Sequence, residues 1–329
     1  MPITSVSKDA ENLTMTVVAD FTAPLQRLWD AYADPRQLEK FWGPPCYPAR
    51  FSRHDFFPGG VSMYTMTGPD GSTHGGYWQW LAVAEPMGAS ASFEVRDGFT
   101  REDGSPNTEM PDMRMVFSFE STSAGSRVTT TTHFNSADQL EQLLGMGMEE
   151  GTRESMSQMD AVLADLTSFA HGVGTRLDIL SDTQVRISRV IRGSVADIWR
   201  AHTEPELMKQ WLLGPDGWVM TECDFPATVG ASYWFAWGRA EDPSEGFGFG
   251  GEIVALEPPH RLVTIERMFG DDGPATVQDI TLTSVESGTL LSQVHTFPSL
   301  EARDKTLETG MVDGMEPTYA RLESLLVSV

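Results

Sequence analysis

Histidines are the first residues in this sequence to consider for acid–base chemistry, because an imidazole changes its charge near neutral pH. Among the seven, His133 and His295 lie near the ends of two similar strand-like segments. Aligning these segments on the glycines that begin them pairs His133 with Thr296, so strand alternation directs the two imidazoles to opposite faces. A shared catalytic role is therefore not expected. His74, at a strand start, and His202, expected on a helix surface, also favour a structural interpretation.

The glycine-rich segment 246–251, Gly-Phe-Gly-Phe-Gly-Gly, satisfies the Gly-x-Gly-x-x-Gly pattern of dinucleotide-binding loops. That loop must open a helix, whereas Glu-Ile-Val-Ala-Leu follows here and is typical of a strand. The sequence contains no His-Glu-x-x-His, paired-cysteine, Gly-x-Ser-x-Gly or P-loop motif. We therefore predict no metal and no cofactor, and we assign no catalytic residue.

Aromatic residues on the predicted strands are the stronger candidates for ligand binding. Tyr233, Phe235 and Trp237 alternate onto one face, and Trp78 and Trp80 share a face in the first half. Core packing is the simpler interpretation. The wall of a ligand cavity is the alternative, because such cavities are lined mainly by apolar and aromatic groups. With methionines near helix-breaking glycines and the two best-placed histidines added, the candidate pocket residues are Tyr64, His74, Trp78, Trp80, Met148, Tyr233, Phe235, Trp237, Phe249, His295 and Met311.

The elements that must position these side chains occur twice in the chain. The segment Leu28–Phe41 recurs at Ile198–Trp211, 170 residues later (198 minus 28), with size and polarity preserved. We therefore predict two domains, residues 1–170 and 171–329, with a linker over residues 170–183. Since Trp29 maps onto Trp199 in this repeat, we expect Trp199 to be a core anchor.

In each half the sequence predicts a strand, two short helices, six further strands and one long helix. Short turns between the strands favour consecutive antiparallel hairpins. The predicted strands of the first half are 14–21, 49–56, 61–67, 74–84, 89–96, 113–120 and 127–134, followed by a helix over 136–169 that its glycines weaken or kink. Those of the second half are 184–191, 219–225, 231–238, 246–256, 261–267, 276–283 and 289–297, followed by a helix over 300–327.

Several motifs in this order carry a resemblance to a known superfamily. They are the spacing of Trp199, Pro205 and Trp211, the Gly-Pro pairs at 43–44 and 214–215, and the Glu-Pro-Pro turn at 257–259. The chain resembles the START-like helix-grip superfamily, in the branch similar to the activator of Hsp90 ATPase C-terminal domain. The resemblance implies an α+β fold of two tandem helix-grip domains, each a curved antiparallel seven-stranded sheet wrapped around a long C-terminal helix. It also implies a mostly apolar pocket between sheet and helix, which the superfamily uses for hydrophobic molecules and occasionally for catalysis.

The composition narrows the class of partner. The formal charge is −24 (23 basic minus 47 acidic residues), so phosphates of nucleic acids and anionic lipid surfaces are repelled. No segment reaches the ~18 apolar residues of a membrane span, and the first residues do not resemble a secretory leader. Cys46 and Cys223 are interpreted as ordinary thiols, which favours a cytoplasmic protein.

We therefore expect a hydrophobic small molecule to bind in a cavity of one or both domains, with the more aromatic second domain preferred. An enzyme of the cyclase or hydrolase kind is the alternative, with His74 and His295 as its best polar groups. A co-chaperone or other protein-interaction module is the third interpretation, and a protein partner or homodimer stays open.

Overall fold

In the computed structural model, the chain is described over residues 2–101, 103–110, 112–165, 174–214, 217–242, 246–270 and 273–327. Its contacts divide it into two compact units, Met1–Phe169 and Ala170–Val329, called here the first and second domains. The predicted domain boundary and the first residues of the predicted linker lie outside the described residues. Among the described helices, none is long and apolar enough to cross a membrane.

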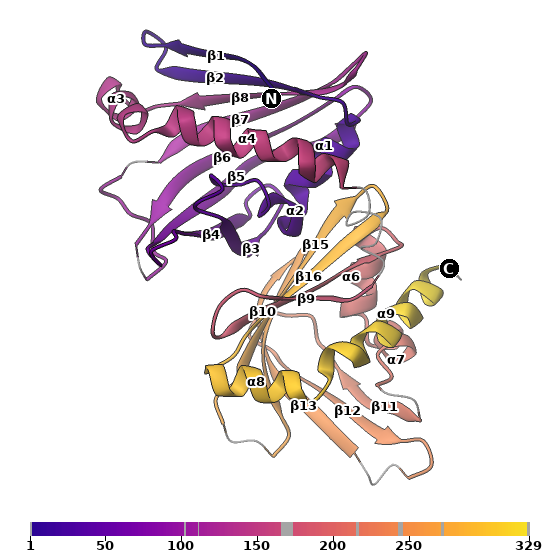
Figure 1. The fold of residues 1–329 in the computed structure, drawn as a ribbon. Coiled ribbons are helices and arrows are strands. Elements are labelled where there is room, and N and C mark those ends of the chain that lie inside the picture. Colours follow the sequence, from indigo (N-terminus) through magenta and orange to yellow (C-terminus); the bar gives the residue numbers. More distant parts are fainter. Residues whose placement is uncertain are drawn as a thin grey trace. The chain divides into compact units, whose positions relative to one another are not determined.

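The first domain is a curved antiparallel sheet with helices on one face (Figure 1). Its strands are β1 (Ile3–Asp9), β2 (Thr14–Phe21), β3 (Ala49–His54), β4 (Val61–Thr67), β5 (Thr73–Met87), β6 (Ser90–Thr100), β7 (Met113–Thr122) and β8 (Gly125–His133), and its helices are α1 (Leu25–Ala33), α2 (Pro35–Leu38), α3 (Ala137–Gly145) and α4 (Met148–Ala164). The strand order is β1-β2-β8-β7-β6-β5-β4-β3. Asp34 accepts a bond from the Arg36 amide and so caps α2, whose first residue is Pro35.

The second domain repeats this plan. Its strands are β9 (Arg176–Ile179), β10 (Gln184–Ile191), β11 (Trp218–Asp224), β12 (Ser232–Arg239), β13 (Gly246–Glu257), β14 (Arg261–Met268), β15 (Thr276–Val285) and β16 (Gly288–Thr296), and its helices are α6 (Val195–Thr203), α7 (Pro205–Trp211), α8 (Leu300–Glu308) and α9 (Met311–Val327). The strand order is β11-β12-β13-β14-β15-β16-β10-β9. The glycine-rich segment begins β13, as the sequence predicted.

Each sheet has eight strands, so the predicted number of seven is wrong. The extra strands are β1, which precedes the first predicted strand, and β9, in the predicted linker. Both are short and largely exposed edge strands that pair antiparallel with β2 and β10. The two apolar residues of β1, Ile3 and Val6, are not spaced at period two, and β9 has only four residues, so neither segment gives a strong strand signal in the sequence. Pairing with an existing edge satisfies their backbone groups.

Each long C-terminal helix is broken in two. Gly147, with φ of 89°, stands between α3 and α4, and Gly310, with φ of 76°, stands between α8 and α9. A left-handed residue ends a helix at little cost only when it is glycine. The end of the first predicted helix, residues 166–169, lies outside the described part of the chain.

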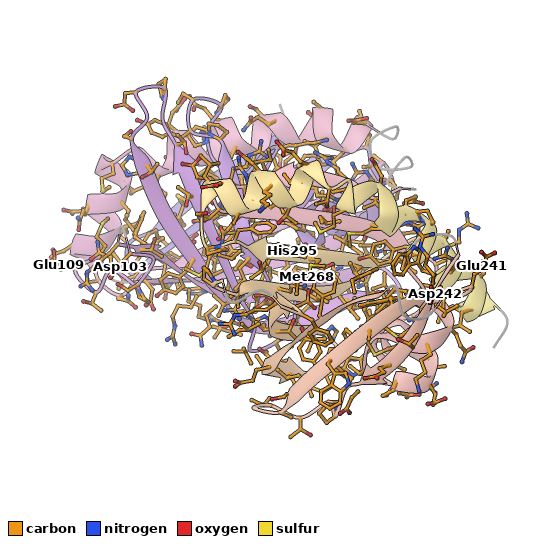
Figure 2. All side chains as sticks on the ribbon, turned by 90° about the horizontal axis from the view of Figure 1, so that it is seen from below. Asp103, Glu109, Glu241, Asp242, Met268 and His295 are labelled. Carbon is orange, nitrogen blue, oxygen red and sulfur yellow. The ribbon has the colours of Figure 1, made fainter. Side chains whose placement is uncertain are left out.

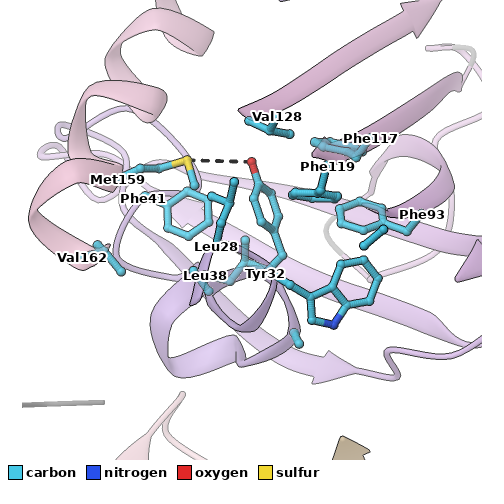
Figure 3. Close-up of a cluster of buried hydrophobic side chains, with 14 of the residues drawn as sticks. Leu28, Tyr32, Leu38, Phe41, Phe93, Phe117, Phe119, Val128, Met159 and Val162 are labelled. Atoms are coloured by element: carbon cyan, nitrogen blue, oxygen red, sulfur yellow. Dashed lines mark hydrogen bonds between the residues drawn. The ribbon is translucent and has the colours of Figure 1, made fainter. Parts of the chain in front are cut away.

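We call the face of each sheet toward the C-terminal helix its inner face. In the first domain, side chains fill this face. Figure 3 shows rings of α1, β6 and β7, together with Phe41, packed with side chains of α4. The rings of Phe93 and Phe117 stack at 4.4 Å, and Trp29 meets Phe119 edge-on at 5.6 Å between centroids. The Tyr32 hydroxyl reaches the Met159 sulfur of α4 at 3.8 Å. This aromatic core leaves the inner face of the first domain closed.

The core of the second domain is divided into two clusters. One contains Ile191, Ile198, Ala201, Trp211, Leu282, Leu291, Tyr319 and Leu322, and the other contains Met208, Phe225, Tyr233, Phe235, Trp237, Ile253 and Leu262. Trp199, Leu212 and Ile280 pack against both clusters and are only partly buried. The side chains where the two clusters meet are therefore less completely buried than those inside each cluster.

No residue of α8 is buried, and the sequence of this helix gives the reason. Ser136 and Ser299 cap α3 and α8 in the same way, each accepting from the amide three residues on. Counting from these caps, Leu140 and Leu143 of α3 correspond to Arg303 and Thr306 of α8 (offset 163). Leu140 and Leu143 are buried, whereas no residue of α8 is. Without an apolar stripe, α8 has little to bury against the sheet.

Candidate functional site

The strand pairings place a carboxylate at the same position of each inner face. Phe117 and Ile280 correspond, since they lie opposite Thr130 and Gln293, which are equally far from the start of the last strand. Phe93, which pairs with Phe117, therefore corresponds to Leu262, which pairs with Ile280. Asp97 and Glu266 lie four residues after Phe93 and Leu262, so they also correspond. Neither carboxylate was predicted as a site residue.

In the first domain, Asp97 is closed off by aromatic donors. The Trp78 indole N–H donates to its Oδ1 at 2.7 Å, and the Tyr64 hydroxyl donates to the same atom at 3.4 Å. Asp97 is 8% exposed, and burial raises its pKa to about 7 although both hydrogen bonds act in the opposite direction. These side chains form a satisfied structural group, since Trp78 is itself fully buried.

Trp80 is the first donor in a second buried chain of hydrogen bonds in the same domain. Its indole N–H donates to Ser62 Oγ at 2.8 Å, and Ser62 lies 2.9 Å from His54 Nδ1. His54 Nε2 lies 3.1 Å from the carbonyl oxygen of Tyr32, which can only accept. The imidazole thus carries its proton on Nε2 and accepts from Ser62. A serine hydroxyl held in this way, with no exposed surface, is not placed to act as a nucleophile.

In the second domain, Glu266 begins a polar row that crosses the inner face, made of Glu266, Gln278, Gln293 and Tyr319. Gln278 Nε2 donates to Glu266 Oε1 at 2.5 Å, and Gln293 Nε2 donates to Gln278 Oε1 at 2.9 Å. The Tyr319 hydroxyl of α9 donates to Gln293 Oε1 at 3.4 Å. Burial raises the pKa of Glu266 to about 7, against the effect of its hydrogen bonds. Glu266 and Gln278 nevertheless keep part of their surface exposed.

The predicted aromatic residues form a wall beside this row. Tyr233, Phe235 and Trp237 are buried in one cluster, with Phe249 partly exposed next to Trp237 at 6.0 Å between centroids. The Tyr233 hydroxyl donates to Glu266 Oε2 at 3.1 Å, and the Trp237 indole donates to the carbonyl oxygen of Leu212 at 2.8 Å. We call Tyr233, Phe235, Trp237 and Phe249 the aromatic wall, and Tyr233 links it to the polar row.

His295 lies on the same inner face of β16, two residues after Gln293 (Figure 2). It is 5% exposed, burial lowers its pKa to about 4, and its Nε2 has no hydrogen-bond partner within the described structure. Its counterpart in the first domain is Thr132, so His133 does lie on the opposite face, as predicted. His295 therefore lies beside the polar row, opposite Gln278, without a hydrogen bond to it in the described structure.

Other predicted residues lie outside these groups. His74 is exposed at the beginning of β5, where its ring is 5.7 Å from that of Tyr47. Met148 packs in a satellite cluster with Leu140 and Leu143, and Met311 is partly buried at the start of α9. His74 lies in the first domain and His295 in the second.

His202 was expected on a helix surface, and that expectation is wrong. Its side chain is buried, its Nδ1 lies 2.8 Å from the carbonyl oxygen of Ile198, and its ring packs 4.8 Å from that of Trp211. Helices α6 and α7 fold back on one another, which buries a face that each would expose alone. Burial lowers the pKa of His202 to about 4.

Sequence reasoning missed the polar row because its members look like ordinary strand polar residues. One signal was available, namely that Glu266 continues the alternation of Leu262 and Thr264, and Asp97 that of Phe93 and Val95. A carboxylate on the apolar side of a strand needs a partner. Asp97 was missed because the predicted strand 89–96 ends one residue before it.

No group of three His, Cys, Asp or Glu residues within the described ranges could hold a metal ion. A pocket of about 260 Å³ lies elsewhere in the second domain, lined by Asp197, Arg200, Ala201, Leu207, Leu325 and Leu326. It shares no residue with the aromatic wall or the polar row. The buried Asp97 and the partly exposed Glu266, with their different surroundings, distinguish the inner faces of the two domains.

Two tandem sheets, each curved around its own C-terminal helix with a pair of helices inserted after an early strand, define a helix-grip protein. The family model described as "Activator of Hsp90 ATPase homolog 1-like protein" matches residues 22–164 and 192–327, so the chain belongs to this family and carries two copies of its domain. No curated protein matches the chain.

Solved structures are similar to one half of the chain. Protein Ms6760 from Mycobacterium smegmatis is 46% identical and covers 50% of this chain and 98% of its own, with a TM-score of 0.46. A protein from Arthrobacter aurescens is 41% identical, covering 49% and 92%, with a TM-score of 0.46. A protein from Rhodobacter sphaeroides is 31% identical, covering 47% and 99%, with a TM-score of 0.45.

Proposed function

We propose that this protein binds a hydrophobic small molecule on the inner face of the second domain, between its sheet and α9. The observation that supports this most is the contrast between two corresponding residues. Phe117 is fully buried among rings in the first domain, whereas Ile280 is partly exposed between two separate clusters in the second. An apolar inner face that is not closed by its own side chains gains free energy when a ligand covers it.

The aromatic wall sets the kind of molecule. Phe247 stacks on Trp237 at 5.2 Å and Phe249 meets it edge-on, so the wall is a rigid surface of rings. A planar aromatic ligand gains about 0.5–1.5 kcal/mol for each ring pair beyond the burial of its area. We place this function in the cytoplasm, where a reducing environment keeps thiols such as Cys46 and Cys223 free.

The test is a fluorescence titration of the full chain with N-phenyl-1-naphthylamine. Ile280→Phe introduces the ring that the first domain has at this position, and we expect it to abolish saturable binding. Phe117→Ile is the reciprocal control in the first domain and should leave the probe affinity unchanged. Binding of the probe should quench the fluorescence of Trp237, and this quenching should be lost in Trp237→Phe. Absence of saturable binding to the wild type, or loss of binding in Phe117→Ile alone, would contradict the proposal.

A protein-interaction role is a second candidate, supported by exposed rings on the outer face of the second sheet. Trp234 is 42% exposed and Phe269 is 53% exposed, and a side chain at Gly250 would touch both. The family is described by its likeness to an activator of Hsp90 ATPase. Stimulation of the ATPase of purified Hsp90, lost in a Trp234→Ala, Phe269→Ala variant that still melts normally, would support this role. No stimulation at saturating protein would exclude it.

A further inference from the structure

The polar row places amides and a carboxylate on an inner face that is otherwise apolar. Gln278 and Gln293 of the second domain correspond to Met115 and Thr130 of the first, where the inner face is otherwise filled by rings. Burying amides and a carboxylate costs free energy unless each is hydrogen-bonded. The second domain therefore maintains a costly polar feature next to its aromatic wall.

The donors of the row all point toward one end. Tyr319 donates to Gln293, Gln293 to Gln278, and Gln278 to Glu266, while Tyr233 donates to Glu266 from the other side. Glu266 is thus the terminal acceptor of the whole row. Each carboxylate oxygen can accept more than one hydrogen bond, so Glu266 retains acceptor capacity after these two.

Glu266 also lies where a ligand could reach it. It is near the end of β14, and both it and Gln278 are partly exposed. His295 lies opposite Gln278 on the neighbouring strand β16. The chain continues from β16 into α8, and no residue of α8 is buried. In the first domain the corresponding carboxylate, Asp97, has Trp78 beside it, and that indole is fully buried.

We infer that Glu266 is the polar end of the binding site and that it selects planar aromatic ligands carrying a hydroxyl group, which donates to its carboxylate while the rings lie against the aromatic wall. This inference rests on the proposed function. Anionic ligands are disfavoured, because their charge would face Glu266 in a protein of net charge −24. A hydroxyl donor is therefore preferred over a fatty-acid or aryl carboxylate.

The test compares three probes of similar size by isothermal titration calorimetry at pH 8, where a group with a pKa of about 7 is mostly ionised. They are 2-naphthol, its methyl ether 2-methoxynaphthalene, and 2-naphthoate. A hydrogen bond to a charged group predicts that 2-naphthol binds at least about 10-fold more tightly than the ether. The ether retains the rings and loses only the donor, and 2-naphthoate should bind most weakly.

Glu266→Gln keeps the shape of the side chain and should reduce the naphthol-to-ether ratio to about 1–3. Asp97→Asn is the matched control, the same kind of change at the corresponding position of the first domain, and should preserve the wild-type ratio. Thermal melts establish that both variants fold. Equal affinities for naphthol and ether in the wild type, an unchanged ratio in Glu266→Gln, or preferred binding of 2-naphthoate overturns the inference and leaves the binding function standing. Failure of all three probes to bind overturns both.

Discussion

Trp78 in the first domain occupies the position that Gly251 holds in the second. Trp78 lies opposite Asp97 and Gly251 lies opposite Glu266 on the neighbouring strand. A Cβ on Gly251 would meet the carbonyl oxygen of Ile265, so this position accepts only glycine. The missing indole lets Tyr233 reach Glu266 from one strand further away. One replacement thus turns a sealed carboxylate into one that partly faces solvent.

Helix α8 should bury more of its surface against the sheet when it is given an apolar stripe. We predict that Arg303→Leu with Thr306→Leu, copying Leu140 and Leu143 of α3, raises the free energy of unfolding by about 1–3 kcal/mol through apolar burial. The same variant should weaken binding of N-phenyl-1-naphthylamine. Urea denaturation and the fluorescence titration measure the two effects.

The control for this pair places two leucines on the exposed side of the same helix. Glu301 and Lys305 are exposed and one turn apart. Glu301→Leu with Lys305→Leu should change neither stability nor probe affinity by a comparable amount. Equal effects from both double variants would show that α8 does not control access to the inner face.

Asp97 should make the protein less stable as the pH rises. Its pKa is 3.8 in a model peptide and about 7 in the fold, so between these values the folded state holds more protons than the unfolded state. The free energy of unfolding must then fall from about pH 4 to about pH 7. Asp97→Asn keeps an oxygen to accept from Trp78 and removes the titration. Its stability should therefore decrease less than that of the wild type between pH 5 and pH 8 in urea denaturation, and equal decreases would refute the assignment.

The two repeated tryptophans should differ in their contribution to stability. Trp29 is 1% exposed, so Trp29→Ala should cost about 3–5 kcal/mol. Trp199 was expected to be an equal anchor, but it is only partly buried where the two clusters meet. Trp199→Ala should therefore cost roughly 1–2 kcal/mol. Urea denaturation that gives the two variants the same loss would show that the second core is as closely packed as the first.

Each half of the chain should fold alone. All strand pairings of a sheet, and all members of each hydrophobic cluster, come from one half. We predict that residues 1–170 and residues 171–329, expressed separately, each show a cooperative thermal transition. A half that melts without cooperativity would mean that its core needs the other half.

The sequence by itself determined the repeat, the family and nearly every strand and helix. These features depend on local patterns such as period-two alternation, the Asp34-Pro35 helix start and glycines in turns. Such patterns can be identified without knowing which residues meet in the tertiary structure. It also determined that the aromatic wall shares a face. It did not reveal β1 and β9, since the apolar residues of β1 are not spaced at period two and β9 has only four residues.

Only the tertiary structure decided which polar residues meet. Glu266, Gln278 and Gln293 stand on three strands and become neighbours through the sheet register, and Tyr319 joins them from α9. A shift of one residue in any of these strands would turn its side chain to the other face. The partial exposure of Ile280 also follows from the tertiary structure. Whether this side chain is covered depends on how α8 and α9 pack, and not on its neighbours in the chain.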